Sequence, residues 1–216
     1  MDRELFPRAR TEIAPGAVHV PDWLDALEQR ELLEACRRWA RPPAGLRTVR
    51  TPGGGTMTAR QVCLGWHWYP YGYARTVVDG DGAPVKPFPA RLGELGRRAV
   101  TDALGDGPAP GPGYDIALVN FYDADARMGM HRDSDEKSHA PVVSLSLGDS
   151  CVFRFGNPET RTRPYTDVEL RSGDLFVFGG PSRPAYHGVP RVHADTGPPE
   201  LGLSGRLNIT LRVSGL

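Results

Sequence analysis

The sequence has no apolar run long enough to cross a membrane, and it has few cysteines. In 216 residues no stretch approaches the roughly 20 apolar residues that span a bilayer. The charged start MDRELFPRAR also lacks the apolar core of a signal peptide. Cys36, Cys63 and Cys151 form no CxxC pair, which argues against a disulfide framework or a zinc knuckle. These absences predict a reduced, cytoplasmic protein with no membrane partner.

Acidic residues are absent between Ala35 and Val78, although the whole chain has a formal net charge of zero. Arginine neutralises phosphates and aromatic faces stack on bases, so this segment is typical of a surface for single-stranded or unpaired nucleic acid. A solvated arginine face over core aromatics has the same composition, and the segment alone favours neither reading. Its arginines and aromatic residues are Arg37, Arg38, Arg41, Arg47, Arg50, Arg60, Arg75, Trp39, Trp66, Trp68, Tyr69, Tyr71 and Tyr73.

Two helices are predicted in the first half of the chain. Apolar residues recur at helical spacing after Asp22 as far as Trp39, and Asp22 is a suitable N-cap. A second helix is predicted from Pro89, although Gly93 and Gly96 weaken its pattern. Between them, the glycine turn in RTPGGGTMT predicts a short strand on either side.

The hydrophobic period changes to strict alternation after a glycine- and proline-rich connector, GDGPAPGPG at residues 105–113. YDIALVNFY, PVVSLSLG, CVFRFG, LFVFGG and RLNITLRV are short β-rich runs separated by turns, which predicts a β-sandwich or barrel. We therefore expect an α+β, mainly β protein. Helices and the basic-aromatic segment, residues 1–112, precede a β-roll at residues 113–216, and both parts belong to one compact unit.

The segment GMHRDSD holds a histidine and an aspartate two residues apart. On a strand such residues point to the same side, so His131 and Asp133 would project a nitrogen and a carboxylate oxygen into one space. His187, in PAYHGV, supplies a third ligand. Two histidines and one carboxylate leave open positions on a metal, as in non-haem Fe(II) oxygenases. The remaining histidines lie before a helix, in the aromatic segment or in polar loops and fit less well: His19, His67, His139 and His193.

The last predicted strand, RLNITLRV, alternates most clearly. Its polar face holds Arg206, Asn208, Thr210 and Arg212. Its apolar face holds Leu207, Ile209, Leu211 and Val213. In IALVNFY, Asn120 and Tyr122 continue an inward apolar stripe. A dicarboxylate inside a barrel needs a bidentate arginine with hydroxyl and amide donors, which these residues can supply. An amphipathic strand with its polar face in water has the same pattern.

The motifs together resemble the bacterial AlkB family of Fe(II)- and 2-oxoglutarate-dependent dioxygenases. The segments that carry the resemblance are TPGGGTMT, LGW, GY, NFYDADARMGMHRDSDE, SLSLG, FRFG, SGDLFVFGG, YHGV and RLNITLR. They keep the family's order from about residue 50 to residue 212. The resemblance implies a double-stranded β-helix, or jelly-roll, core with an N-terminal, helix-containing nucleotide-recognition lid.

The resemblance also implies roles for individual residues. Iron would be bound by His131, Asp133 and His187, and 2-oxoglutarate by Asn120, Tyr122, Arg206, Asn208 and Arg212, with Arg212 also counted as catalytic. Substrate would contact Trp66, which matches the aromatic residue that stacks on the flipped base, and also Tyr73, Asp135 and Arg161. Arg161 lies in a loop of different length beside Arg163, and Gly55 stands where the family has a tyrosine. These two departures concern substrate contacts and substrate range.

The implied activity is oxidative demethylation, a direct-reversal repair of N-alkylated bases such as 1-methyladenine and 3-methylcytosine. The substrate would be single-stranded DNA, with RNA as a further candidate, and the enzyme would act as a monomer. Fe(II) is the cofactor, 2-oxoglutarate and O2 are cosubstrates, and succinate, CO2 and formaldehyde are products. Two alternatives remain open: a dioxygenase of this class acting on a small molecule or a protein side chain, and a metal-binding β-barrel without catalysis.

Overall fold

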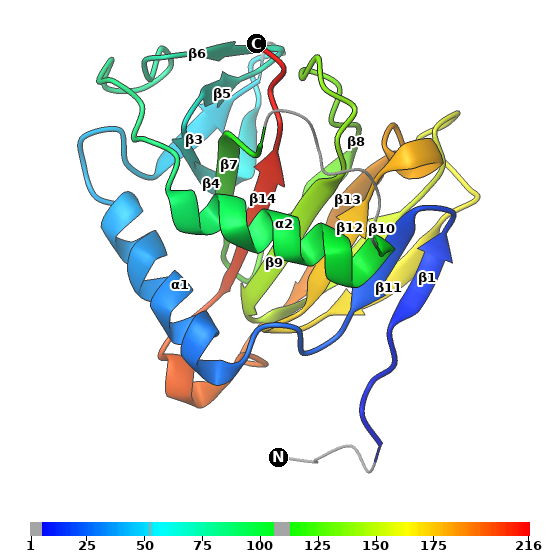
Figure 1. Ribbon diagram of the computed structural model, residues 1–216. Helices are drawn as coiled ribbons and strands as arrows, with labels where there is room; N and C mark the ends of the chain where they lie inside the picture. Colours follow the sequence, from blue (N-terminus) through cyan, green and yellow to red (C-terminus); the bar gives the residue numbers. More distant parts are fainter. Residues whose placement is uncertain (1–5, 52, 106–112) are drawn as a thin grey trace.

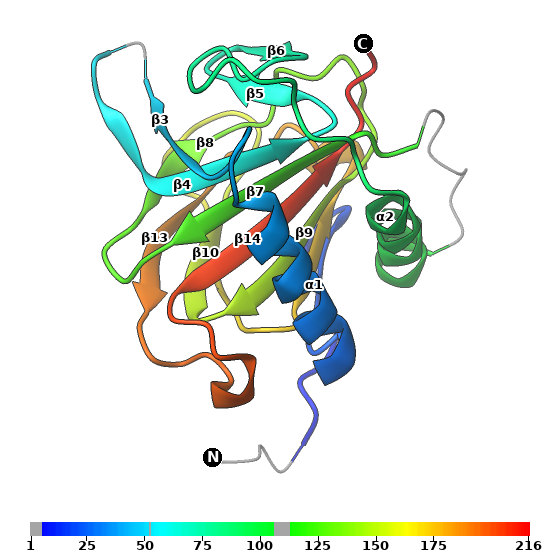
Figure 2. The same ribbon diagram turned by 90° about the vertical axis from the view of Figure 1, so that its left-hand side faces the viewer.

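The chain folds into three layers, with two helices, a large sheet and a small sheet stacked in that order. The computed structural model describes residues 6–51, 53–105 and 113–216 (Figure 1). Helices α1 (Ala26–Trp39) and α2 (Ala90–Leu104) cover one face of the large sheet, and the small sheet faces its other side (Figure 2). A two-stranded hairpin, β5 (His67–Tyr69) and β6 (Gly72–Ala74), lies at the end where the chain terminates.

Both sheets are antiparallel, and their strands are not in chain order. The large sheet runs β1 (Thr11–Ala14), β2 (Ala17–Val20), β12 (Leu175–Phe178), β9 (Val142–Gly148), β14 (Arg206–Arg212), β7 (Ile116–Tyr122), β4 (Thr56–Leu64), β3 (Arg47–Arg50). The small sheet runs β11 (Thr166–Leu170), β10 (Ser150–Phe155), β13 (His187–His193), β8 (Met128–His131). Short 3-10 helices occupy Gly180–Ser182 and Pro199–Leu201.

The path of the chain through these strands is that of a jelly-roll. From β7 to β14 the strands pass repeatedly between the large and the small sheet, which confirms the predicted double-stranded β-helix. Strands β1 to β4 extend the large sheet at its two ends, so strands from both sides of the expected boundary at residue 112 pair within one sheet. Most of the predicted connector, residues 106–112, lies outside the described residues.

Helix α1 begins later than predicted. The cap is Asp25, whose side chain accepts from the N–H of Glu28 at 2.8 Å, while the Glu28 side chain accepts from the N–H of Asp25. This capping box satisfies two helix-end donors at once. The prediction of Asp22 as the cap was wrong, because Asp22 has a φ of 53° and its carboxylate instead accepts a hydrogen bond from Arg8. The helix ends at Trp39, as predicted.

Helix α2 begins directly after Pro89, as predicted, and its glycines serve close packing. Gly96 faces Tyr114, and a Cβ at Gly96 would lie 2.5 Å from Cδ2 of that ring. The apolar residues of α2 are buried in the core between the helices and the large sheet: Leu92, Leu95, Ala99 and Ala103. A second core fills the space between the two sheets, where the rings of Phe153, Phe155 and Phe176 lie against one another.

The N-terminal hairpin β1–β2 is anchored to the remainder of the large sheet by Asp174, whose side chain is fully buried. Arg8 donates to both carboxylate oxygens of Asp174, at 2.8 and 2.6 Å. Nε2 of His19 lies 2.9 Å from Oδ2, and the N–H of Asp22 donates to Oδ1 at 3.0 Å. Burial alone would raise the pKa of Asp174, but hydrogen bonds from His19, Arg8 and backbone N–H groups lower it to about 2.

Asp174→Asn should lower the free energy of unfolding by about 2–3 kcal/mol at pH 7. The folded-state pKa of about 2 lies below the ordinary value of about 3.9, so this stabilisation is present above that value and is lost as the pH falls toward 2. Urea unfolding of both proteins should therefore give a smaller difference at pH 3 than at pH 7. Asp167→Asn, on an exposed ion pair, is the control and should cost less than about 1 kcal/mol. A difference that does not change with pH would contradict the prediction.

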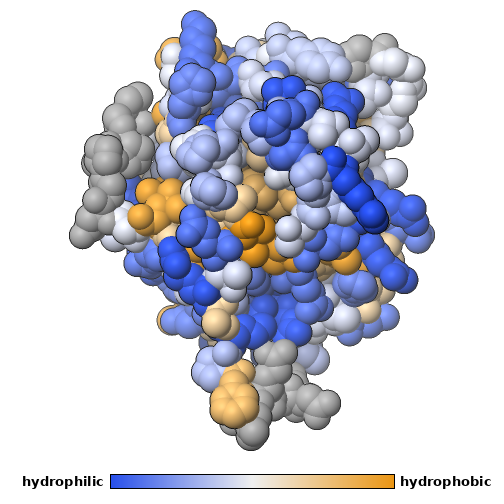
Figure 3. Space-filling model, turned by 90° about the vertical axis from the view of Figure 1, so that its right-hand side faces the viewer, coloured by the Kyte–Doolittle hydropathy of each residue, from blue (hydrophilic) through white to orange (hydrophobic). Residues whose placement is uncertain are grey.

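The surface seen from the β1 side is mostly hydrophilic, with hydrophobic residues gathered in one band across its middle (Figure 3). Across the described part of the chain, no helix is both long enough and apolar enough to span a membrane. The cysteines Cys36, Cys63 and Cys151 are buried and unpaired, in agreement with the expectation of no disulfide framework.

Candidate active site

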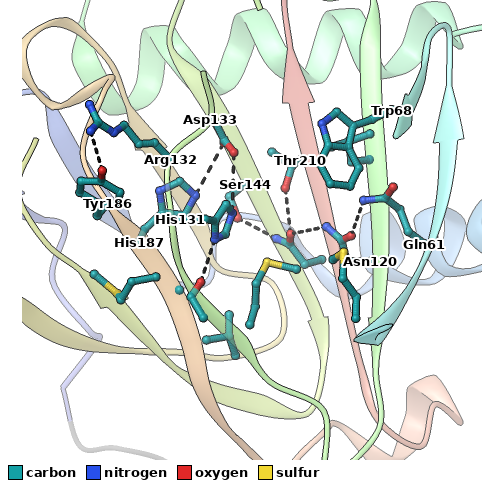
Figure 4. Close-up of a pocket in the computed structure, with 18 of the residues that line it drawn as sticks. Gln61, Trp68, Asn120, His131, Arg132, Asp133, Ser144, Tyr186, His187 and Thr210 are labelled. Carbon is teal, nitrogen blue, oxygen red and sulfur yellow. Dashed lines mark hydrogen bonds and ion pairs between the residues drawn. The ribbon is translucent and has the colours of Figure 1, made fainter. Parts of the chain in front are cut away.

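Strands β8 and β13 bring the three predicted metal ligands together. These strands are neighbours in the small sheet, and their register sets His131 directly opposite His187. Strand β8 ends at His131, so Asp133 follows the strand. The sequence had predicted that Asp133 lies on the strand. The spacing of two residues still places its carboxylate within reach, and candidate ligand atoms of the three residues lie within 4.8 Å of one another (Figure 4).

Backbone carbonyls orient both histidine rings. Nδ1 of His131 lies 2.9 Å from the carbonyl oxygen of Gly129, and Nδ1 of His187 lies 3.1 Å from that of Ala185. A carbonyl only accepts, so each Nδ1 carries the proton and each Nε2 keeps its lone pair for a metal. Burial lowers the pKa of His187 to about 4, which keeps this ligand neutral at pH 7.

Asp133 supplies the negative charge of the metal set. Burial would raise its pKa, but interactions with Arg212, His187 and His131 outweigh burial and lower it to about 2. Oδ1 accepts a hydrogen bond from Nη2 of Arg212 at 2.6 Å. Within the described ranges Oδ2 is buried without a hydrogen-bond partner, which is costly for a carboxylate oxygen. Two Nε2 atoms and this oxygen fit Fe(II), with positions left for other ligands.

Among the described residues, Arg206 has the most buried side-chain polar atoms that lack a hydrogen-bond partner. Only 1% of the residue is exposed, and its Nη2 donates to Oγ of Ser146 at 3.0 Å. Its Nε and Nη1 are buried without any partner among the described residues. A buried guanidinium whose Nε and Nη1 lack partners is suited to a negatively charged acceptor such as a carboxylate. The distal carboxylate of 2-oxoglutarate fits this position.

A row of amide side chains crosses the large sheet beside Arg206. The strand register aligns Gln61, Asn120 and Asn208 on β4, β7 and β14. Gln61 donates to Oδ1 of Asn120 at 3.0 Å, Asn120 donates to Oδ1 of Asn208 at 3.5 Å, and Asn208 donates to Oγ of Ser144 at 2.7 Å (Figure 4). Tyr122 pairs in register with Arg206, and burial raises the pKa of Tyr122, so its hydroxyl stays protonated as a donor.

These groups line one cavity of about 680 Å³, a volume typical of ligand sites. The polar face predicted for the last strand lines it in full, whereas the opposite face is buried in the helix-side core. Of the predicted substrate residues, Asp135 and Arg161 line the cavity. Arg163 does not; its Cζ lies 5.7 Å from the centre of the Tyr165 ring, so the structure separates the two arginines that the sequence left together.

Trp66 is placed differently from Trp68. Trp66 is absent from the cavity lining; its Nε1 donates to Asp115 at 3.1 Å, and the Arg75 guanidinium covers its ring at 3.3 Å from the centroid. Trp68 lines the cavity, and its Nε1 donates to Oδ2 of Asp135 at 2.7 Å. The stacking role of Trp66 stays a prediction.

Tyr73 and Gly55 also lie outside the cavity lining. The hydroxyl of Tyr73 donates to Glu136 and accepts from Arg212 at 3.4 Å, so the β5–β6 hairpin is tied to the residue that holds Asp133. Gly55 accepts a hydrogen bond from the N–H of Thr51 at 2.8 Å, and Thr51 lines the cavity. The substrate contact of Tyr73 and the effect of Gly55 on substrate range stay predictions.

Sequence reasoning missed Glu136 and Arg183. The Glu136 side chain is fully buried and pairs with Arg212 at 2.8 Å and with Arg183 at 3.0 Å. Arg183 also donates to the backbone oxygen of Asp133 at 2.6 Å. Together they fix the loop that carries Asp133 and Asp135. Alternation in PVVSLSLG, where two serines share one face, was a usable signal for Ser144 and Ser146, the partners of Asn208 and Arg206.

Several arginines of the acid-free segment contact other side chains of the protein. Arg47 pairs with Asp79 at 2.8 Å, Arg75 covers Trp66, and Arg60 lies 5.0 Å from the Phe121 ring centre. The arginines at the cavity come from the β-roll instead: Arg132, Arg161, Arg206 and Arg212.

A jelly-roll with a two-histidine, one-carboxylate set, of which Asp133 and His187 are buried, and a buried arginine without an ion-pair partner among the described residues of the same cavity defines the class of Fe(II)- and 2-oxoglutarate-dependent oxygenases. The model of the 2OG-Fe(II) oxygenase superfamily matches residues 16–212. The chain belongs to this superfamily and, within it, to the AlkB family. The cofactor set of the superfamily is Fe(II) with 2-oxoglutarate and O2, and the donor groups described above fit it.

The chain is similar to proteins from bacteria and plants. It is 37% identical to the alpha-ketoglutarate-dependent dioxygenase AlkB homolog of Caulobacter vibrioides, over 93% of this chain and 88% of that protein. It is 36% identical to the alpha-ketoglutarate-dependent dioxygenase AlkB of Escherichia coli, over 78% of this chain and 77% of that protein. The DNA N(6)-methyladenine demethylase ALKBH1C of Arabidopsis thaliana is 33% identical over 94% of this chain, which spans about half of that relative. The structure of OsALKBH1 superposes with a TM-score of 0.83 at 30% identity, over 94% of this chain and 99% of that one.

Proposed function

We propose that the protein removes methyl groups from N-methylated bases of nucleic acid by oxidation. The observation that carries this proposal is that the metal set, the unpaired Arg206 and the Trp68–Asp135 pair line the same cavity. The methyl group of such a base lies on its pairing edge, so the base must leave the stack to reach the metal. We infer single-stranded DNA as the first substrate class, RNA as the second, and a monomer as the acting species.

The side chains have separate tasks in this reaction. When bound, Fe(II), 2-oxoglutarate and O2 supply the oxidising power that hydroxylates the methyl carbon, and the hydroxymethyl group then leaves as formaldehyde. Arg206 holds the distal carboxylate of the cosubstrate, and the Tyr122 hydroxyl donates beside it. Arg212 fixes Oδ1 of Asp133, which leaves Oδ2 directed toward the metal position. The walls of the cavity orient the base and exclude water.

Asp135 favours adenine and cytosine, which carry an amino group at the ring position where guanine and thymine carry a carbonyl oxygen. Its carboxylate only accepts hydrogen bonds, so it can bind the amino group of adenine or cytosine and repels the carbonyl oxygen of guanine or thymine. 1-Methyladenine and 3-methylcytosine also carry a positive ring charge at neutral pH, which a carboxylate attracts. We therefore rank these lesions above N6-methyladenine, the base in the names of the Arabidopsis relatives.

The test is incubation of the protein with Fe(II), 2-oxoglutarate and oligonucleotides that carry one 3-methylcytosine, 1-methyladenine or N6-methyladenine. Loss of the methyl group by mass spectrometry, with formaldehyde and succinate formed in equal amounts, is the expected result for the first two. It should require both Fe(II) and 2-oxoglutarate. Succinate formation without methyl loss from any oligonucleotide would instead favour a small-molecule or protein substrate.

Trp68→Ala should lower kcat/KM for a 3-methylcytosine oligonucleotide roughly tenfold or more, because stacking of a base on an aromatic ring is worth about 1–3 kcal/mol. Trp68→Phe keeps a ring and loses only the hydrogen bond to Asp135, so its loss should be smaller. Trp66→Ala in parallel tests the role predicted for Trp66. If Trp68→Ala demethylates at the wild-type rate, Trp68 is not the stacking residue.

A reducing compartment such as the cytoplasm is part of this proposal. Three buried, unpaired thiols support it, because such thiols persist where disulfides are kept reduced. Burial also raises the pKa of Cys36 to about 12, which keeps this thiol protonated and unreactive.

A further inference from the structure

The lid hairpin β5–β6 turns through two residues, Pro70 and Tyr71, between the paired residues Tyr69 and Gly72. Proline fixes φ near −65°, and Tyr71 takes a φ of 72°. This combination is typical of a type II turn, whose second central position favours glycine or asparagine. An aromatic residue there is strained, because its Cβ lies too close to the following carbonyl oxygen.

No polar or ring contact within the described ranges compensates for this strain. Tyr71 is 81% exposed, and among the described residues it has no hydrogen bond, ion pair or ring contact. Residues held in sparsely populated backbone conformations cluster at ligand-binding sites, where the strain positions a contact for a ligand. The location of Tyr71 relative to the cavity therefore indicates which ligand the ring contacts.

Tyr71 stands at the mouth of the active-site cavity. The exposed large hydrophobic residues of the described chain are Phe6, Leu27, Tyr71, Val78 and Leu216, and of these only Tyr71 lines the cavity. His187, inside the same cavity, is 6% exposed. When a base reaches the metal set, its neighbours in the strand stay outside the cavity, on the exposed side where the tyrosine ring lies.

The cavity lining also carries positive charge at exposed residues. Arg132 and Arg161 are exposed and converge on Tyr186: Arg132 donates to its hydroxyl at 2.5 Å, and Cζ of Arg161 lies 5.5 Å from its ring centre. All three line the cavity with Tyr71. Guanidinium groups beside an aromatic ring match the phosphates and bases on either side of a flipped nucleotide.

We propose that Tyr71 is a stacking platform for the base next to the flipped base. This inference rests on the proposed function and deepens it, because it makes the substrate an oligonucleotide with a flanking base and not an isolated nucleotide. The strained turn lowers local stability, and it holds the ring above the cavity mouth. Removing the ring should consequently weaken oligonucleotide binding while relieving the strain.

The experiment compares wild type, Tyr71→Gly, Tyr71→Phe and, as a control at an exposed aromatic residue away from the cavity, Phe6→Gly. The probes are a trinucleotide with central 3-methylcytosine, the matching mononucleotide, and trinucleotides with fluorescent 2-aminopurine on the 5′ or the 3′ side. Binding is measured with Mn(II) and 2-oxoglutarate under argon. Thermal unfolding of each variant is measured in parallel.

In wild type and Tyr71→Phe, the trinucleotide should bind more tightly than the mononucleotide, and 2-aminopurine on one side should be quenched by stacking. Tyr71→Gly should lose the quenching and roughly fivefold or more of the trinucleotide affinity. Its melting temperature should equal or exceed that of wild type by up to roughly 4 °C, because glycine accepts the positive φ. Phe6→Gly should bind as wild type does.

Two results separate this inference from the proposed function. If wild type demethylates the trinucleotide but Tyr71→Gly keeps full affinity and quenching, the stacking platform is overturned and the demethylase proposal stands. If wild type binds and quenches but demethylates no oligonucleotide, the stacking platform stands and the demethylase proposal fails. A Tyr71→Gly protein that melts well below wild type would also overturn the inference, because the ring would then serve the fold.

Discussion

Replacing His187 with alanine should abolish Fe(II) binding and all turnover of a methylated oligonucleotide. The Nε2 of His187 and that of His131 belong to neighbouring strands in fixed register, and two ligands cannot hold a facial site. Loss of a residue that merely supports a ligand costs roughly 10–100-fold in metal affinity, so loss of the ligand itself should cost more than roughly 100-fold. Isothermal titration with Mn(II) under argon measures the affinity, and succinate formation measures turnover.

His139→Ala is the matched control. His139 is exposed, belongs to the same loop region as Asp133 and lies outside the cavity lining, so this variant should bind metal and turn over as wild type does. Thermal unfolding of metal-free His187→Ala checks that the sheets remain folded. Wild-type turnover by a folded His187→Ala protein would refute the metal assignment.

Side-chain periodicity was sufficient to predict which residues of the last strand share one face. Alternation in the last strand separated its polar and apolar faces, and the structure buries one face under the helices and turns the other into the cavity. The HxD spacing brings His131 and Asp133 together for a different reason. Asp133 follows β8, and Arg183 holds its backbone carbonyl while Arg212 holds its carboxylate. Short spacing kept the two ligands close, although strand alternation did not position them.

Contacts between distant parts of the chain could not be predicted from periodicity. Arg183 resembles any loop arginine in the sequence, and only the fold buries it against Glu136, 47 residues away. The two tryptophans of LGWHW are equivalent by composition, and the course of β5 decides which one lines the cavity. The start of α1 is a different case, because Asp25 and Glu28 show the spacing of a capping box, which identifies the cap from sequence alone.

Arg206→Met should raise the KM for 2-oxoglutarate roughly 100-fold or more while Mn(II) binding survives. Breaking a buried charge pair by removing one partner costs about 2–5 kcal/mol, and the cosubstrate carboxylate would lose its charged hydrogen-bond donor. Initial rates of succinate formation at increasing 2-oxoglutarate measure the effect. Arg154→Met, at a partly exposed arginine of β10 paired with Asp167, is the control and should keep the wild-type KM.

The same variant distinguishes a ligand-binding arginine from a structural one through stability. In the protein without ligand, Nε and Nη1 of Arg206 are buried without partners among the described residues, so the guanidinium contributes little to the fold or opposes it. Ligand-free Arg206→Met should therefore melt at or above the wild-type temperature. Addition of Mn(II) and 2-oxoglutarate should raise the melting temperature of wild type but hardly that of Arg206→Met, because only binding to the folded state stabilises it. If Arg206→Met melts lower without ligand and keeps the shift with 2-oxoglutarate, Arg206 supports the sheet and the cosubstrate carboxylate binds elsewhere.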